Sequence, residues 1–232
     1  MKIMLSPYQE KEEGLIDLYL FRHGYTCYNR ENRYQGRSDL PLLEEEFSRI
    51  RPYSFFPEKD IGRFLAPKTG NAPAQKTRRW NSEKKGSGPY RDGTIRDVVY
   101  VSGALRTRQT AELLFPGMEQ IVIPQFHEMD FGIFEGRSAE EMKSDPQYRK
   151  WVDSMCEDPV PGGESRAQFT ERVTDRFYAL VQQTVRESRK RLLIVAHGGT
   201  QMAVMDCYCE ENRPYWSWST LPGEAIIAKL RV

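Results

Sequence analysis

Four short apolar runs, separated by helix-like stretches, constrain the fold of this chain more than any other feature. They are LIDLYLF (15–21), DVVYVS (97–102), RLLIVAH (191–197) and AIIAKL (225–230), and QIVIP (120–124) is a shorter candidate. Because the runs are rich in β-branched and aromatic residues and do not alternate strictly, they predict strands that are buried on both faces of a sheet. Strands alternating with helices indicate an α/β fold, a three-layer sandwich whose largely parallel central sheet is flanked by helices.

The clearest helix is predicted to begin after Ser165. Its hydroxyl can cap the first turn, and Gln168, three residues later, completes a capping box. The apolar residues that follow keep to one helical stripe: Phe169, Val173, Phe177, Leu180, Val181 and Val185. We expect this stripe to face the core.

Arginine and histidine side chains follow three of the predicted strands. Arg22 and His23 come after the first, Arg106 lies a few residues beyond the second, and His197 ends the third. Ligands of open α/β sheets bind beyond the carboxyl ends of the strands, so we expect these side chains to meet at one edge. Arginine grips phosphate oxygens with its planar fork, and imidazole supplies a donor or a nucleophile. A glycine after each histidine would let backbone N–H groups at a helix start approach a phosphate closely. The pattern therefore predicts a site for a dianion.

The charge balance gives the chain no general attraction to polyanions. Its 232 residues include 34 Lys and Arg and 33 Asp and Glu, for a net charge of +1. We therefore expect neither a nucleic-acid nor a membrane partner, and the sequence leaves the oligomeric state open. No apolar run approaches the roughly 18 residues of a membrane span, and the N-terminal residues lack the apolar stretch of a signal peptide, so we expect a cytoplasmic protein. The four cysteines (Cys27, Cys156, Cys207 and Cys209) do not have the spacing of a zinc site and are expected to be structural thiols.

The segment from about residue 52 to 92 breaks the alternation of strands and helices. It is rich in proline, glycine and basic residues, and residues 68–91 carry seven Lys or Arg against Glu83 alone, a net charge of +6. This composition favours a solvated loop over packed structure. Three interpretations stay open: a tolerated surface insertion, a lid or docking surface over an anionic site, and a nucleic-acid contact.

Five sequence blocks resemble the histidine phosphatase superfamily, in its phosphoglycerate mutase-like branch. They are RHGYTCYNRENRYQGRSDLPL, SGALRTRQTAELL, EMDFGIFEGRS, PGGES and VAHGG, and they occur in the family's order from about residue 17 to the end. Two features depart from the family pattern. Gly103 and Ala104 stand where Pro-Leu is usual, and the stretch from about 52 to 92 is longer than the family's helix and linker. The resemblance implies one histidine phosphatase domain over residues 1–232, with an insertion at about 52–92.

The resemblance also implies roles for individual residues. His23 would be the nucleophile that forms a phosphohistidine, while Arg22, Arg106 and His197 would clamp the phosphoryl group. Asn29 would donate to the same oxygens, and Gln35 and Gly36, the family's Gln-Gly turn, would belong to the substrate-binding loop. No cofactor or metal is implied, because arginines replace the magnesium ion that many phosphoryl-transfer enzymes use.

The proton for the leaving group is expected from Glu128, the position that matches the family's carboxylate. A bound phosphate disfavours a second negative charge nearby, so the carboxyl group would stay protonated for the first step and then activate water. Asp130 and Glu135 are the alternatives within the same block. His127 is expected to point away from this carboxyl and to be structural or at the rim of the substrate site.

The FGIFEGRS block is most similar to α-ribazole phosphatase-like and broad-specificity phosphatases. The mutases of the family are expected to show a Tyr-Gly block and a Leu-Asn-Lys stretch, and neither occurs here. The sequence thus predicts a phosphomonoesterase that hydrolyses a small phosphorylated metabolite. The alternatives are a phosphoglycerate mutase-type phosphoryl transfer and a phosphate-binding docking protein with weak catalysis.

Overall fold

The computed structural model describes residues 4–6, 16–53 and 97–231, with backbone alone for residues 4–6. Most of the segment at about 52–92 lies outside the described residues. In this part of the chain, the strands are β1 (Met4–Ser6), β2 (Ile16–Arg22), β3 (Val98–Val101), β4 (Glu119–Val122), β5 (Arg191–Ala196) and β6 (Ala225–Arg231). The five strands that the sequence predicts are therefore confirmed, and β1 is an additional strand.

The sheet has the order β1-β6-β2-β5-β3-β4. Its four strands β2, β5, β3 and β4 pair in parallel, whereas β6 runs antiparallel to both β2 and β1. The sheet is thus largely parallel, as predicted, and β2 lies between two strands from the C-terminal part of the chain. This order makes β2, β5 and β3 direct neighbours, so the residues that follow them meet at one edge.

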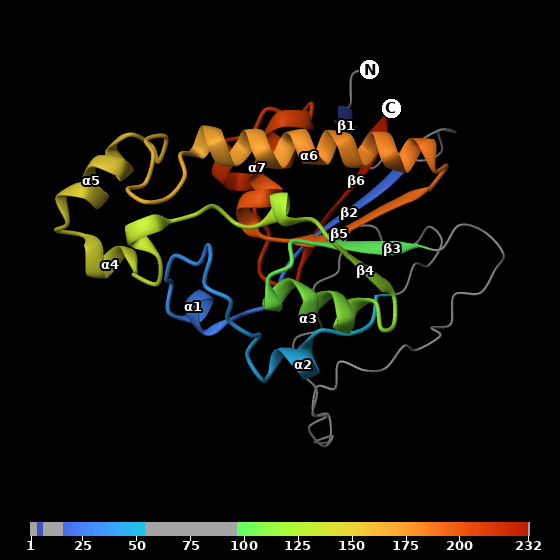
Figure 1. Ribbon diagram of the computed structural model, residues 1–232, viewed down its shortest axis with the longest axis horizontal. Helices are drawn as coiled ribbons and strands as arrows, with labels where there is room; N and C mark the ends of the chain where they lie inside the picture. The colour runs from blue at the N-terminus through green and yellow to red at the C-terminus, as the bar shows by residue number, and fades with distance from the viewer. Residues whose placement is uncertain (1–3, 7–15, 54–96, 232) are drawn as a thin grey trace.

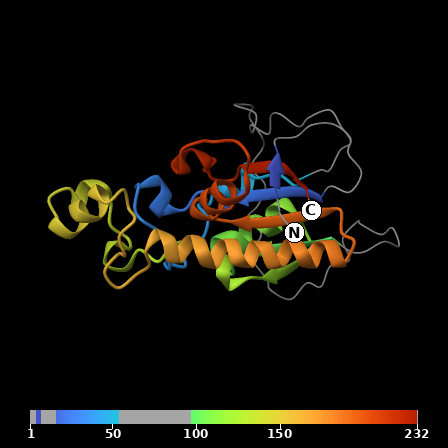
Figure 2. The ribbon, with the colours of Figure 1, turned by 90° about the horizontal axis from the view of Figure 1, so that it is seen from above.

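Helices cover both faces of the sheet (Figures 1 and 2). The helices are α1 (Cys27–Arg30), α2 (Glu46–Arg49), α3 (Leu105–Leu114), α4 (Ala139–Met142), α5 (Pro146–Asp153), α6 (Arg166–Arg186) and α7 (Gly198–Tyr208), with short 3₁₀ turns η1 (Pro124–Phe126), η2 (Gly132–Phe134) and η3 (Tyr215–Trp218). In Figure 1, α6 and α7 lie on one side of the sheet and α3 and α2 on the other. The α4–α5 region extends beyond the same end of the sheet as α1.

Successive residues of the central strands point to opposite faces and build two cores. Leu192 and Ile194 of β5 belong to the cluster that also contains the buried stripe of α6, whereas Leu193 and Val195 belong to the cluster beneath α3. Both faces are buried, which explains why β5 shows no polar alternation in the sequence.

Helix α6 begins as predicted. Ser165 is its N-cap and accepts from the Gln168 N–H at 3.1 Å, while the Gln168 side chain accepts from the Ser165 N–H at 2.9 Å. The predicted stripe is wrong at its last position, because Val185 is 38% exposed and Thr184 is buried instead. Thr184 can occupy the apolar face because its hydroxyl donates to the carbonyl of Leu180, one turn earlier.

Candidate active site

The ends of β2 and β5 bring His23 and His197 together. Arg22 and Ala196 are in register in the parallel pair, and the His23 N–H donates to the Ala196 carbonyl at 3.0 Å. The two imidazole rings, which come next along each strand, have their centroids 5.2 Å apart. The prediction that these strand ends meet at one edge is therefore confirmed.

One nitrogen of His23 is fixed by its neighbour. Nδ1 lies 2.7 Å from the carbonyl oxygen of Gly24. A carbonyl only accepts hydrogen bonds, so Nδ1 carries the hydrogen and the neutral ring keeps its lone pair on Nε2. Burial, and then the charge of Arg106, hold the pKa of His23 well below its ordinary value. The buried ring is thus a neutral imidazole whose lone pair lies on Nε2.

His197 is fixed through its other nitrogen. Its Nε2 lies 2.8 Å from the hydroxyl of Ser102, the residue after β3, and the ring is fully buried. Burial lowers the pKa of His197 well below its ordinary value, and the charges of Arg106 and His23 lower it further. The His127 ring is nearly parallel to His197, with centroids 6.4 Å apart, so it lies at the border of the same group.

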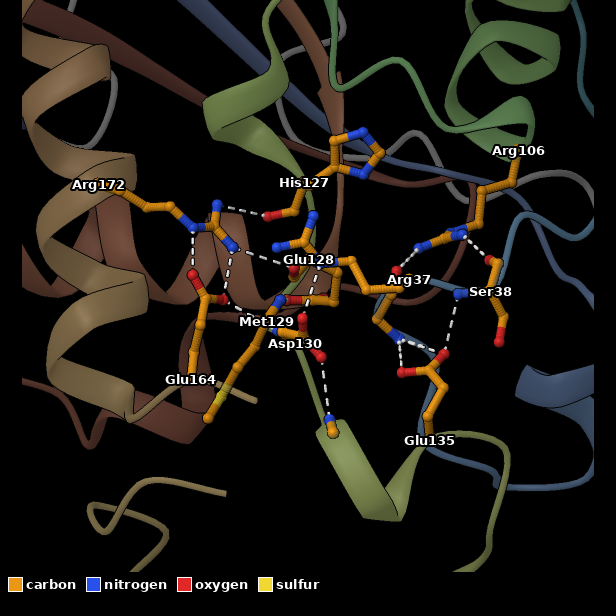
Figure 3. A network of polar contacts seen from close by, with 12 residues as sticks. Arg37, Ser38, Arg106, His127, Glu128, Met129, Asp130, Glu135, Glu164 and Arg172 are labelled. Carbon is orange, nitrogen blue, oxygen red and sulfur yellow. Dashed lines mark hydrogen bonds and ion pairs between the residues drawn. The ribbon is translucent and has the colours of Figure 1, made fainter. Parts of the chain in front are cut away.

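Arg106 is a buried cation that has no carboxylate among its hydrogen-bond partners in the described part of the chain. Its side chain is on α3 and fully buried, and Nη1 and Nη2 donate to the carbonyls of Ser38 (2.8 Å) and Gly36 (3.1 Å), as Figure 3 shows. Burial lowers the pKa of Arg106, although the carboxylates around it, Glu128 first, act in the opposite direction. A buried guanidinium that donates only to neutral carbonyls is well suited to receive an anion.

Arg22 is held by the segment that precedes β6. Its Nη1 donates to the Ser219 hydroxyl at 3.1 Å and to the Thr220 carbonyl at 2.7 Å. Burial lowers its pKa too, against the opposing charge of Glu128. These contacts with the segment before β6 fix the guanidinium next to His23.

Unpartnered polar atoms gather around the two histidines. Within the described part of the chain, eight buried side-chain nitrogen or oxygen atoms lack a hydrogen-bond partner. Five of them are nitrogens of this group: Nε of Arg22, Nε2 of Gln35, Nε of Arg106, Nδ1 of His127 and Nδ1 of His197. Buried polar groups are normally paired, so this concentration of nitrogens is typical of a site that binds an anion.

The loop from Thr26 to Gly36 carries the remaining predicted residues. Asn29 Oδ1 accepts from the Thr26 N–H at 3.0 Å, and Asn29 lines a hollow of about 390 Å³ together with Arg22. Gln35 Oε1 accepts from the Thr26 hydroxyl at 2.7 Å. Gly36 has both backbone groups in use: its N–H faces the Glu135 carboxylate at 3.0 Å, and its carbonyl accepts from Arg106. Gly36 therefore holds Arg106 in place, and a Cβ there would lie 2.0 Å from the Met129 carbonyl oxygen.

Glu128 lies against the first turn of α7. Its Oε2 accepts from the Gly199 N–H and its Oε1 from the Met129 N–H, both at 2.9 Å. A Cβ at position 199 would lie 2.1 Å from Oε1, so this contact depends on glycine. Glu128 thus lies two residues after the end of η1. It is beside α7, the helix that begins directly after His197.

The two alternative carboxylates have other partners. Asp130 accepts from the Gly132 N–H at 3.0 Å and from Arg37 Nε at 3.1 Å. Glu135 accepts from the N–H groups of Gly36 and Ser38, at 3.0 Å each. Figure 3 shows both carboxylates in these contacts, which hold the loop that carries Arg37 and Ser38.

The sequence model of the histidine phosphatase superfamily (branch 1) matches residues 18–51 and 88–225. The chain belongs to the histidine phosphatase superfamily. It is therefore a phosphatase or phosphoryl-transfer enzyme. The two matched stretches leave out residues 52–87, which fall within the segment interpreted above as an insertion.

Relatives of this chain include proteins named as phosphatases and proteins named as phosphoglycerate mutases. A protein of Hydrogenobacter thermophilus that is provisionally named phosphoserine phosphatase 2 is 27% identical over 194 residues, which cover 81% of this chain and 76% of that protein. The crystal structure of phosphoglycerate mutase from Thermus thermophilus has a TM-score of 0.56 at 28% identity and covers 91% of this chain and 92% of its own. A structure from Escherichia coli, provisionally described as an alpha-ribazole-5'-P phosphatase, has a TM-score of 0.63 at 21% identity, with 94% and 95% coverage, and shows the shared fold.

Arg172 and Glu164 lie beside the segment that carries Glu128, and the sequence analysis named neither of them as a site residue. Arg172, on α6, donates to both carboxylate oxygens of Glu164, at 2.6 and 2.7 Å. It also donates to three carbonyls of the segment that carries Glu128, those of Gln125 (2.8 Å), His127 (2.9 Å) and Glu128 (3.1 Å). Figure 3 shows this guanidinium bridging α6 and the segment.

Burial acts to raise the pKa of Glu164, but the hydrogen bonds from Arg172 and from the Asp130 N–H outweigh it and leave the pKa lowered. Glu164 lies in the PGGES block, and this block was the sequence feature that could have identified it as a site residue. Nothing in the helical pattern of α6 distinguishes Arg172. The pair fixes the backbone of Glu128, and we regard both as positioning residues.

No three His, Cys, Asp or Glu side chains among the described residues form a group that could hold a metal ion. In the same ranges, no helix has both the length and the apolar character needed to cross a membrane.

Proposed function

We propose that this protein is a phosphomonoesterase that hydrolyses a small phosphorylated metabolite through a phosphohistidine at His23. The observation that carries the proposal is the state of His23, a buried neutral imidazole with Nδ1 fixed by Gly24 and Nε2 free, next to two arginines. A nucleophile of this kind divides one difficult displacement into two easier steps.

In the first step, His23 Nε2 attacks the phosphorus atom, the P–N bond forms, and the P–O bond to the leaving alcohol breaks. Glu128 donates its proton to the leaving oxygen. In the second step, Glu128 takes a proton from water, whose oxygen attacks phosphorus, and the P–N bond breaks to release inorganic phosphate. Each step restores the proton that the other one uses, so the enzyme returns to its starting state.

The cationic and polar groups around His23 hold the phosphoryl oxygens in this proposal. Arg22 and Arg106 supply positive charge, and Asn29, Gln35 and His197 supply further nitrogens. Because phosphoryl transfer is promoted mainly by positioning and electrostatics, these groups suffice without a metal ion. His197 can donate through Nδ1 as a neutral ring whose Nε2 accepts from the Ser102 hydroxyl, or as a protonated ring, which a bound dianion would favour.

The second candidate is a mutase-type transfer, in which a second substrate hydroxyl replaces water as the acceptor. The names of relatives favour it, since a protein of Erwinia tasmaniensis named as a probable phosphoglycerate mutase is 27% identical over 188 residues.

A steady-state assay with p-nitrophenyl phosphate, with and without a chelator, tests the proposal. We expect release of phosphate in both conditions. A panel that contains α-ribazole phosphate and 3-phosphoglycerate then separates the reactions, because a mutase would isomerise phosphoglycerate faster than it releases phosphate. Absence of phosphate release from every ester of the panel would overturn the proposal.

A further inference from the structure

An aromatic hollow of about 230 Å³ adjoins Glu128 on the side of α5, α6 and η3. Most of its lining is aromatic or sulfur-containing: Tyr34, Met129, Phe131, Trp151, Cys156, Phe169, Met202, Tyr215 and Trp216, with Glu128, Arg166 and Gly199 completing it. A cavity of about 150 Å³ already accommodates benzene, so this hollow has room for one substituted ring. None of the cationic residues around His23 lines it.

The rings of the hollow support one another. Tyr34 contacts Phe131 and Trp151, with centroids 4.9 and 5.7 Å apart, and the Tyr34 and Tyr148 hydroxyls are 2.9 Å apart. Trp216 is 47% exposed, so it forms part of the opening. Packed aromatic walls with an opening to solvent favour a flat apolar guest.

The one cation of the lining is already in use. Arg166 is ion-paired with Glu157, and its guanidinium carbon lies 5.1 Å from the Tyr215 ring centroid and 5.9 Å from that of Trp216. The described lining thus offers no free positive charge to a carboxylate or a second phosphate. A glycerate would bring a carboxylate into the hollow with no free cation to pair with it. A neutral ring needs no such partner and leaves the Arg166–Glu157 ion pair intact.

Glu128 belongs both to this hollow and to the surroundings of the arginines. Its carboxylate lines the hollow beside Gly199, and its charge acts on both Arg22 and Arg106. If Glu128 protonates the leaving oxygen, the group attached to that oxygen extends past Glu128 into the hollow. Tyr34 lines this hollow and also the one that contains Arg22 and Asn29, so the two spaces are neighbours.

We propose that the aromatic hollow binds the leaving group, and that the substrate is the phosphomonoester of an apolar, ring-bearing alcohol. This inference rests on the proposed function, since it uses the role of Glu128. The sequence predicted only a small phosphorylated metabolite, and this inference narrows that class to the esters of apolar, ring-bearing alcohols.

Binding of two phosphonates tests the inference without turnover, because their C–P bond is not hydrolysed. Methylphosphonate occupies the anion site alone, whereas benzylphosphonate adds one ring. Isothermal titration of the full chain should show that benzylphosphonate binds about ten- to a hundredfold more tightly, the range for burying one aromatic group. Inorganic phosphate serves as the probe of the anion site.

Two variants localise the preference. Trp216→Ala opens the hollow and Met202→Trp fills it, and both should reduce the preference for benzylphosphonate over methylphosphonate by about tenfold. Phe47→Ala is the matched control, because Phe47 lies on α2 and is 44% exposed, close to the exposure of Trp216, but does not line the hollow. It should keep the wild-type preference.

The outcomes separate the two proposals. Equal affinities of the wild type for both phosphonates would overturn the leaving-group subsite and leave the anion site intact. A preference that survives both Trp216→Ala and Met202→Trp would place the ring elsewhere and also overturn it. Failure of inorganic phosphate and both phosphonates to bind would instead overturn the proposed function.

Discussion

At the scale of single residues, one hydrogen bond decides which nitrogen of His23 carries the lone pair of the neutral ring. The Gly24 carbonyl holds the hydrogen on Nδ1, and Gly24 itself is confined, because a Cβ there would lie 2.5 Å from Glu46 Oε2. Glu46 Oε2 also accepts from the Tyr25 N–H at 2.9 Å. The turn after β2 is thus fixed by a buried carboxylate, and the imidazole on it has one orientation.

His23→Ala should abolish phosphomonoesterase activity and retain the fold, because the His23 side chain bonds only to the adjacent Gly24 carbonyl among the described partners. The measurement is a phosphoenzyme trap with labelled substrate. Acid-labile, base-stable phosphate should appear on the wild type and not on the variant, with circular dichroism as the control for folding. Recovery of phosphoserine or phosphocysteine would refute the mechanism.

Glu128→Gln should slow the hydrolysis of alkyl phosphates far more than that of p-nitrophenyl phosphate, whose leaving group needs little protonation. General acid catalysis is typically worth about 10²- to 10⁴-fold. Comparison of kcat for the two substrates measures the effect. Asp130→Asn is the matched control, because Asp130 is engaged with Arg37 and Gly132 and should affect both substrates alike. Equal slowing of both substrates by Glu128→Gln would remove Glu128 from this role.

All three histidines should be mostly neutral at pH 6.5 in the free enzyme. His23, His127 and His197 are the three histidines of the chain, and burial is the first cause that lowers the pKa of each. Nitrogen-15 NMR of the three imidazoles, assigned with single variants, measures this directly. Because unfolded imidazoles bind protons first, below about pH 6.5, the free energy of unfolding should fall as the pH drops below that value. An imidazole that titrates above pH 6.5 would contradict the expectation.

At the scale of elements, the first two residues of α7 decide how closely this helix approaches Arg22 and Glu128. A Cβ on Gly198 would lie 2.7 Å from the Ser219 hydroxyl and 3.3 Å from Arg22 Cζ, while one on Gly199 would meet Glu128. The two glycines therefore allow the first turn of the helix to pack against the guanidinium and the carboxylate at once. They explain in physical terms why glycines follow His197.

Gly199→Ala should lower activity although alanine is the better helix former by about 1 kcal/mol. The added methyl would lie 2.1 Å from Glu128 Oε1 and 2.9 Å from Phe169 Cζ, so the carboxylate must move. We expect kcat for alkyl phosphates to fall by about tenfold or more, in line with a displaced general acid. A double-mutant cycle with Glu128→Ala provides the control, since the substitution should have little further effect there. Additive losses would show that Gly199 acts independently of Glu128.

The sequence predicted the elements that local pattern determines. The strands and the start of α6 followed from apolar runs and a capping box, and the meeting of Arg22, His23 and His197 followed from parallel neighbours. It did not predict the role of Arg172, because the contact that matters joins α6 to the carbonyl of Glu128, 44 residues away. The sequence also did not explain why Gly103 stands where the family has proline. The φ of Gly103 is +98°, which proline cannot adopt, so this departure has a local backbone cause.

At the scale of the whole molecule, the site is assembled from both ends of the chain. Strand β2 pairs with β5 and β6, so residues near position 20 are held by residues beyond position 190. Arg22, for example, donates to Ser219 and Thr220, 197 and 198 residues away. Local opening of either end would take the anion site apart, and we expect binding and folding to be tightly linked.

Inorganic phosphate should therefore raise the melting temperature of one cooperative transition. At a concentration of 100 Kd, a ligand that binds only the folded state stabilises it by about 2.7 kcal/mol, which corresponds to roughly 5–10 °C for a domain of this size. Differential scanning calorimetry at matched ionic strength, with chloride in place of phosphate, measures the shift. The Arg106→Met variant should lose most of this phosphate-induced shift, whatever its melting temperature without phosphate. The reason is that the substitution removes the buried guanidinium from the proposed anion site. Two transitions, of which phosphate moves only one, would show that the two ends of the chain fold separately.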